Sequence, residues 1–345
     1  MASTAHRADG ADSAAEPRGW AATTSPRHRA RRALLGSAPI LFVLLAVLIA
    51  IALRNPQGAS PEYYLALLKR AAPLMLLAAG QLFVIVSGEF DLSVGSIITA
   101  VVVMAAVLTR GDPAQTYLVI AVMLGFGVLV GLANGMITTR LGVPSFIVTL
   151  GMGLAIAGGV LFYTGGAPRG SMPENFRVFG RQGIEDLPLV GELPYSVIIL
   201  VIAGAAAFVL MHRTNFGRQL FAVGGNARAA ALSGTSVANV RTFALVISGV
   251  SAILAGILVG GFGGLSNDAG SGYEFQAISA VVLGGAVLGG GRGSVVTAMA
   301  GALTLEALFT LLNLLRVDVE YRFTLQGLII IAAVAYASYR LRGSR

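Results

Sequence analysis

Long apolar runs separated by short polar segments make up most of this chain of 345 residues. A run of about 20 apolar residues forms a helix long enough to cross the hydrocarbon core of a bilayer. The pattern therefore predicts an all-α, polytopic integral membrane protein with about ten transmembrane helices. The predicted spans are 33–53, 71–87, 93–109, 117–137, 145–163, 194–211, 242–263, 275–289, 294–312 and 323–339.

The composition agrees with a membrane protein. Hydrophobic residues make up 56% of the chain and charged residues 12%, about half the charged share of a typical soluble domain. The net charge of +8 comes from basic residues at span ends and in the tail, so membrane topology explains it better than a nucleic-acid-binding face. With no Cys and three scattered His residues, no metal site or cofactor is expected.

The first 32 residues are rich in Ala, Ser, Thr, Pro and Arg and have no hydrophobic period, which predicts a disordered cytosolic tail. Several Arg residues directly precede the run 33–53, which is too long for the apolar core of a cleaved signal peptide. We expect a signal anchor with its N-terminus inside, and Arg31 and Arg32 are less well explained as a twin-arginine export signal. The predicted domains are this tail and one transmembrane domain, 33–345.

One polar segment, residues 212–241, stands out between long hydrophobic runs, and we call it the central island. It holds Arg213, Arg218, Arg228 and Arg241 and no Asp or Glu, which is typical of a cytosolic loop. Gly224, Gly225 and Asn226 predict a turn and a helix cap, and residues 227–232 predict one short helix. The island is either an ordinary basic loop or a docking helix for a cytosolic partner.

The distribution of Lys and Arg supports an orientation with both termini cytosolic in the inner (plasma) membrane. The predicted inside segments hold 15 of the 24 basic residues. Without the tail, the inside and outside segments hold nine each. The orientation therefore depends on the first anchor and the central island.

Three features within the apolar runs have alternative explanations. Glu89 and Asp91 interrupt the hydrophobicity, and they either lie in a turn that protrudes into water or caps the next helix, or mark a helix break that lines a pathway. Glu306 lies in the middle of a predicted span, as a packing contact or as a proton site. Gly127 and Gly131 have the four-residue spacing that permits close helix contact in lipid.

Three separated stretches resemble one family. Residues 222–258, 88–96 (GEFDLSVGS) and 269–294 are similar to motifs of the ribose-type sugar permeases of ABC importers, and the resemblance covers roughly residues 63–337. It implies a subunit without catalytic chemistry that forms the translocation pathway. The implied partners are a cytosolic ATPase, a periplasmic sugar-binding protein and a second permease, identical or similar.

The resemblance also implies roles for particular residues. Sugars need neutral and acidic hydrogen-bonding groups beside aromatic faces, and the candidate pathway residues are Gln81, Glu89, Asp91, Ser93, Asn134, Tyr273, Glu274 and Gln276. The family commonly has an acidic residue where Gln276 stands. The candidate residues for coupling to the ATPase are Arg218, Gly224, Gly225, Asn226, Ala227, Ala230, Ala231 and Gly234, the last of which forms a small docking face with the three alanines.

The predicted function is import of a monosaccharide such as ribose or xylose, and other functions fit less well. Permeases for branched-chain amino acids or nucleosides are close alternatives, although residues 91–96 resemble the sugar branch. A proton-coupled secondary transporter would need a titrating group such as Glu306 within the membrane. Residues 289–293 (GGGRG) lack the Lys and Ser or Thr of a phosphate-binding loop, and a membrane enzyme would lack a nucleophile.

Overall fold

The computed structural model describes residues 26–55, 58, 60–188, 191–318, 321, 324–325, 327–328 and 331. The chain divides into two units, Met1–Gly36 and Ser37–Arg345, and the description below concerns the second. The predicted disordered tail lies largely outside the described residues, and so does most of the last predicted span, 323–339.

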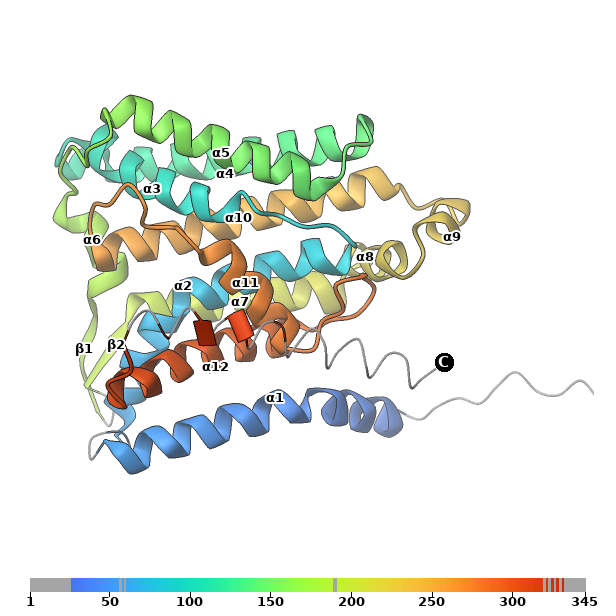
Figure 1. Cartoon of the computed structure of the whole chain (residues 1–345), viewed down its shortest axis with the longest axis horizontal. Coiled ribbons are helices and arrows are strands. Elements are labelled where there is room, and N and C mark those ends of the chain that lie inside the picture. Colours follow the sequence, from blue (N-terminus) through green and yellow to red (C-terminus); the bar gives the residue numbers. More distant parts are fainter. Residues whose placement is uncertain are drawn as a thin grey trace, which may run out of the picture. The chain divides into compact units, whose positions relative to one another are not determined.

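Helices account for most of the described chain (Figure 1). Nine of them coincide in position with predicted spans, although α1, α2 and α10 begin earlier than predicted and α11 ends earlier, at Leu283. They are α1 (Pro26–Arg54), α2 (Pro61–Val86), α3 (Val94–Thr109), α4 (Thr116–Arg140), α5 (Ser145–Thr164), α7 (Tyr195–Arg213), α10 (Val237–Gly263), α11 (Tyr273–Leu283) and α12 (Val295–Leu314). Within the described residues, six helices are long and apolar enough to cross a membrane and three apolar helices are shorter. The predicted count of about ten spans is therefore not confirmed.

Helix α2 begins at Pro61, about ten residues before the second predicted span. It runs without interruption to Val86 and contains Pro73. Ser60 caps this helix by accepting a hydrogen bond from the backbone N–H of Tyr63 at 3.3 Å. Lys69 and Arg70 therefore lie on the same long helix as the apolar residues that follow.

The longest predicted external loop, 165–193, contains regular structure that the apolar pattern does not reveal. It includes α6 (Glu174–Arg181) and an antiparallel hairpin of β1 (Gly183–Leu187) and β2 (Gly191–Pro194). Ile184 pairs with Leu193 in this hairpin. The prediction of an all-α fold is correct for the membrane helices and wrong for these two short strands. A short helix of three residues, η1 (Pro113–Gln115), also precedes α4.

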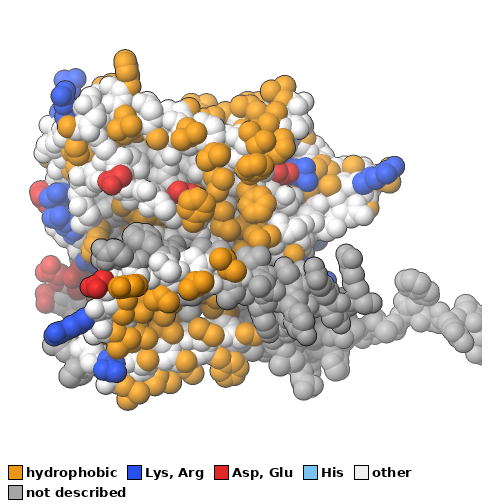
Figure 2. Space-filling model, in the orientation of Figure 1, with side chains coloured by type: hydrophobic (Ala, Val, Ile, Leu, Met, Phe, Trp, Pro, Cys, Tyr) orange, Lys and Arg blue, Asp and Glu red, His pale blue; other side chains and the backbone are white. Residues whose placement is uncertain are grey.

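The helices α2 and α10 form the centre of the bundle. In Figure 1, α10 lies between α4 and α2, and it packs against both of them and against α3. Leu77, Leu82 and Phe83 of α2 are completely buried. The peripheral helices instead expose large hydrophobic side chains, such as Leu154 (68%) and Phe162 (91%) of α5. Figure 2 shows hydrophobic side chains over the middle of one face, with most Lys and Arg toward the ends of the helices.

The prediction of close glycine contacts is confirmed between α4 and α10. A Cβ atom on Gly131 would lie 2.6 Å from the Cα of Val246, and one on Gly127 would lie 2.9 Å from the carbonyl oxygen of Gly249. Gly135, one turn further along α4, is equally close to Thr242. Helices without a hydrophobic driving force between them associate through such backbone contact.

We expect Gly131→Leu to destabilise the protein, because the new side chain would meet backbone atoms of α10 that cannot rotate away. The cost should be about 1–3 kcal/mol or more. It should appear as a lower melting midpoint and a smaller monodisperse fraction in detergent. Gly125→Leu on the same helix is the control, since a Cβ there meets nothing within 4 Å. Equal losses in the two variants would contradict this packing.

Candidate functional site: a polar line through the helices

The helix break between α2 and α3 is buried inside the protein. Its backbone is irregular. The N–H of Phe90 donates a 3.0 Å hydrogen bond to the hydroxyl of Ser145 on α5, and the N–H of Leu92 donates one of the same length to the hydroxyl of Thr149. Irregular backbone at membrane depth is stable only where protein groups or a water-filled cavity satisfy it. The structure therefore excludes a turn that simply protrudes into water, whereas the lining of a pathway by this break stays a prediction.

A cluster of buried polar side chains surrounds this break. The Oδ1 atom of Asp91 accepts hydrogen bonds from the backbone N–H (3.0 Å) and the hydroxyl (2.6 Å) of Ser93, at the start of α3. The Ser93 hydroxyl also accepts a 3.1 Å hydrogen bond from the amide of Asn134 on α4. Ser248 of α10 lies close to the same carboxyl group. We call Asp91, Ser93, Asn134 and Ser248 the buried polar cluster.

Some buried polar groups nearby have no protein partner among the described residues. Gln81, fully buried on α2, has both amide atoms without a hydrogen bond, and the Oδ1 atom of Asn134 is also unpaired. An unpaired buried polar group costs about 1–3 kcal/mol. A ligand rich in hydroxyl groups can form hydrogen bonds with such donors and acceptors.

Glu89 does not join the cluster. Its Oε1 atom lies 2.8 Å from Nη1 of Arg241, the last residue of the central island, so the pair links the helix break to α10. Both residues line a cavity of about 420 Å³ at the island end of the helices, together with Thr138 and Thr139 of α4. We call this the inner cavity.

A second cavity, which we call the outer cavity, has a volume of about 210 Å³ and lies at the opposite end of α2 and α10. Lys69, Arg70, Ser196, Tyr273 and Glu306 are among its lining residues. Nε of Arg70 lies 3.9 Å from Oε1 of Glu306. Glu306 therefore lines this cavity and lies beside a cationic partner, Arg70. This arrangement favours the interpretation of Glu306 as a packing contact over that of an isolated proton site.

The buried polar cluster lies between the two cavities along α10. On α10, Arg241 lines the inner cavity, Ser248 lies roughly 10 Å further along, and Leu258, which lines the outer cavity, about 15 Å beyond that. On α2, Arg70 lines the outer cavity and Gln81 lies further along, toward the helix break. Gly80 packs beside Ser248, so this part of α2 lies at the level of the buried polar cluster. The buried polar cluster thus lies between the cavities, and we call the whole arrangement the polar line.

The candidates on α11 lie at different places. Tyr273 lines the outer cavity. The carboxylate of Glu274 lies against Gly95 at the start of α3, with no room for a Cβ. Gln276 is partly exposed and is not among the residues that line either cavity. Glu274 is not among these lining residues either, and the pathway roles of Glu274 and Gln276 stay predictions.

The central island contains two helices. The predicted helix is present as α9 (Ala227–Leu232), and Asn226 caps it by accepting a 3.0 Å hydrogen bond from the N–H of Ala229. A preceding helix, α8 (Asn215–Gly225), was not predicted. Gly224 and Gly225 form its last turn, so the interpretation of these two glycines as a separate turn is wrong.

Gly224 remains helical because it fits against backbone from two other segments. A Cβ atom on it would overlap the carbonyl oxygen of Val86 and the N–H group of Gly291. Gly291 donates a 2.9 Å hydrogen bond to that same carbonyl, and Gly290 lies against Gly224 and Gly88. We call these five residues the glycine junction. It joins the end of α8, the end of α2 beside the helix break, and the loop before α12.

The predicted docking face of α9 needs correction at one position. Ala230 is 4% exposed and packs into the core of its own chain. The other predicted members, Ala227, Ala231 and Gly234, are partly or fully exposed, as is Arg218 on α8. Leu232 is 85% exposed at the end of α9. The accessible face therefore centres on Ala231 and Leu232.

Comparisons with known proteins address the chain as a whole. A family model described as the permease component of branched-chain amino acid transport systems matches residues 63–334. The ribose import permease protein of Bacillus subtilis is 36% identical over 303 residues, which cover 86% of this chain and 90% of that protein. The xylose transport system permease protein of Escherichia coli is 30% identical, with 85% and 90% covered. No solved structure matches this chain.

We expect Glu89→Gln to lower stability by about 1–2 kcal/mol, because it leaves the half-buried guanidinium of Arg241 without its counter-charge. The double variant with Arg241→Gln should lose less than the sum of the two single variants, measured from melting midpoints. The pair of Glu174 and Arg177 is the control, because the Glu174 side chain is 80% exposed, and Glu174→Gln should change stability little. Additive losses at Glu89 and Arg241 would contradict an energetic link between them.

Proposed function

The chain belongs to the family of permease components of branched-chain amino acid transport systems, and we propose that it imports a monosaccharide with energy from a separate ATPase. Members of this family are transmembrane transport proteins and not enzymes. Several relatives are named as import permeases for ribose, galactose or xylose. The proposed substrate is a sugar of the ribose or xylose kind.

The buried polar cluster is the observation that carries this proposal. Asp91, Ser93, Asn134 and Ser248 lie at a break between two helices and between two cavities. Sugar hydroxyls both donate and accept hydrogen bonds, which suits an acidic group beside amides and hydroxyls. In this proposal the sugar passes along the polar line, and Gln81, Glu89, Tyr273 and Glu274 border its route. Gln276 has a smaller part in this proposed route, because it is partly exposed and lines neither cavity.

The central island is the proposed coupling element. The accessible face of α9 offers Leu232 and small neighbouring residues to a groove on a cytosolic ATPase. The glycine junction then provides a route from the island to the helix break, because backbone contact without side chains cannot absorb a displacement. The ion pair of Arg241 and Glu89 provides a second route.

The remaining components of the proposed importer follow from this assignment. A sugar-binding protein delivers the substrate to the outer cavity, and a second permease, identical or similar, completes the assembly. The island and both chain termini face the cytosol in the inner membrane, with the α6 and hairpin segment on the other side. Amino acid or nucleoside import is a less favoured alternative, because the named sugar permeases match most of the chain. The ion pair of Glu306 and Arg70 weighs against proton coupling.

We expect Leu232→Glu to abolish ATPase binding and sugar uptake while the protein still folds and inserts. The reason is that a docked carboxylate would lose its water without gaining a partner, at a cost of several kcal/mol if fully buried. The measurement is co-purification of the ATPase that is retained by the tagged wild-type chain, together with uptake of labelled ribose and xylose.

Two variants serve as controls for this experiment. Leu232→Met keeps the apolar contact and should retain both activities. Leu315→Glu places the same change on an exposed leucine just after α12, at the opposite end of the helices, and should leave ATPase binding intact. Normal binding and normal uptake by Leu232→Glu would refute α9 as the coupling element.

A further inference from the structure

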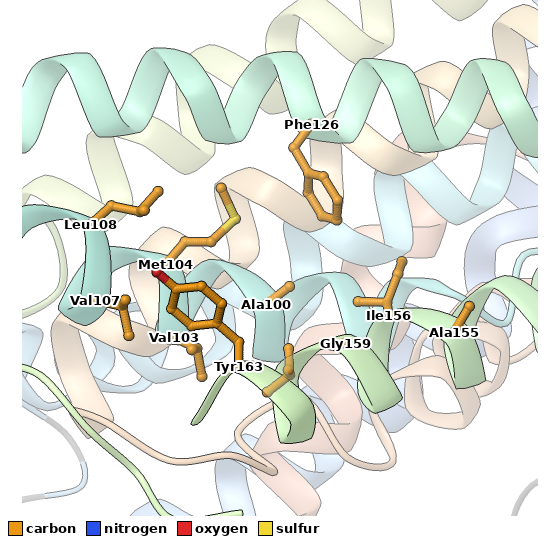
Figure 3. Close-up of a pocket in the computed structure, with 11 residues that line it drawn as sticks. Ala100, Val103, Met104, Val107, Leu108, Phe126, Ala155, Ile156, Gly159 and Tyr163 are labelled. Atoms are coloured by element: carbon orange, nitrogen blue, oxygen red, sulfur yellow. The ribbon is translucent and has the colours of Figure 1, made fainter. Parts of the chain in front are cut away.

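A groove lined only by hydrophobic residues and one glycine opens between α3, α4 and α5. Its volume is about 520 Å³. Figure 3 shows side chains from all three helices around it, including Met104 of α3, Phe126 of α4, and Ile156 and Tyr163 of α5. On α3 its lining runs from Ala100 to Leu108, about 12 Å along the helix axis. That length is close to the depth of one leaflet of a bilayer, whose full core is about 30 Å.

The groove adjoins a polar pocket at the ends of α3 and α5. This pocket has a volume of about 380 Å³, and Val107 and Tyr163 line both spaces. Arg110 and Arg169 also line it. Neither arginine lies within 4 Å of a carboxylate among the described residues. The nearby carboxylate of Asp112 accepts a hydrogen bond from Ala114, and that of Glu174 pairs with Arg177.

We propose that these two spaces together bind one phospholipid with an anionic headgroup. An acyl chain occupies the apolar groove, and the headgroup phosphate lies between Arg110 and Arg169. The guanidinium groups supply the charge and hydrogen-bond donors that match a phosphate. In the orientation proposed above, the lipid belongs to the outer leaflet.

The chemistry of the two spaces favours a lipid over other occupants. A sugar would leave its hydroxyl groups unpaired in the apolar groove, where burial without hydrogen bonds is costly. A second permease would need a side chain to fill the groove and a carboxylate to meet the two arginines. A lipid brings the apolar chain and the negative charge in one molecule, in the same order along the membrane normal.

The test uses the purified full-length protein and native mass spectrometry after exchange into detergent with phosphatidylglycerol or phosphatidylcholine of the same acyl chains. The wild type should retain one phosphatidylglycerol per chain and bind phosphatidylcholine more weakly. The variant R110Q/R169Q should lower phosphatidylglycerol affinity about tenfold or more, to the level of phosphatidylcholine. Arg140→Gln, at the other end of α4, should change neither affinity.

A second pair of variants tests the apolar part separately. Gly159 lines the groove, and a Cβ there meets nothing within 4 Å, so Gly159→Leu should fill the groove and weaken both lipids without disturbing the fold. Gly158→Leu is the matched control, because its neighbourhood is equally open but it does not line the groove. Equal lipid retention by all variants would overturn the proposal. The proposal would also be overturned if the wild type bound no lipid and Gly159→Leu changed the oligomeric state of the protein.

Discussion

A stretch of irregular backbone between α2 and α3, residues 87–93, has to be stabilised in the interior of an otherwise helical membrane protein. Its N–H groups cannot rely on water there, and each unsatisfied group costs several kcal/mol in lipid. Ser145 and Thr149 of α5 therefore face the break, and Asp91 binds the start of α3 through Ser93. The same requirement explains why this break is surrounded by α4, α5 and α10. The polar groups that satisfy the backbone also form the most polar part of the buried interior.

Close contact between backbones connects this break to the rest of the molecule. Gly131 of α4 packs directly against the backbone of α10, and Gly224 of α8 packs directly against the backbone at the end of α2. Such contacts are stiff, because no side chain lies between the backbones to change rotamer. A displacement of the central island should consequently reach the helix break without being lost in side-chain motion. In the proposed importer, these glycines thus have a mechanical role in addition to their role in packing.

The positions of the membrane helices could be predicted from the sequence, because apolar runs of membrane length have few alternatives. The cap at Asn226 and the helix after it were predictable for a similar reason, since both depend on local chemistry. The hairpin of β1 and β2 and the helix α8 were not, because both lie in polar segments that lack the long apolar run of a membrane helix. Ala230 shows the same limit: a six-residue helix has small residues on several sides, and only the fold determines which side is buried. The partners of Glu89 and Glu306 were equally hidden, because Arg241 and Arg70 lie far away in sequence.

The central claim is that the buried polar cluster belongs to the route of the sugar, and Ser248 allows a direct test. This residue is fully buried, and the chain has no native Cys, so Ser248→Cys creates a single reactive site. The measurement is its reaction with a small water-soluble thiol reagent in the importer reconstituted with its ATPase and binding protein. We predict that the thiol is unreactive without ATP, reacts during turnover with ATP, and is protected by a high concentration of the transported sugar. A thiol that stays unreactive in every state while the sugar is imported at the normal rate would contradict the account.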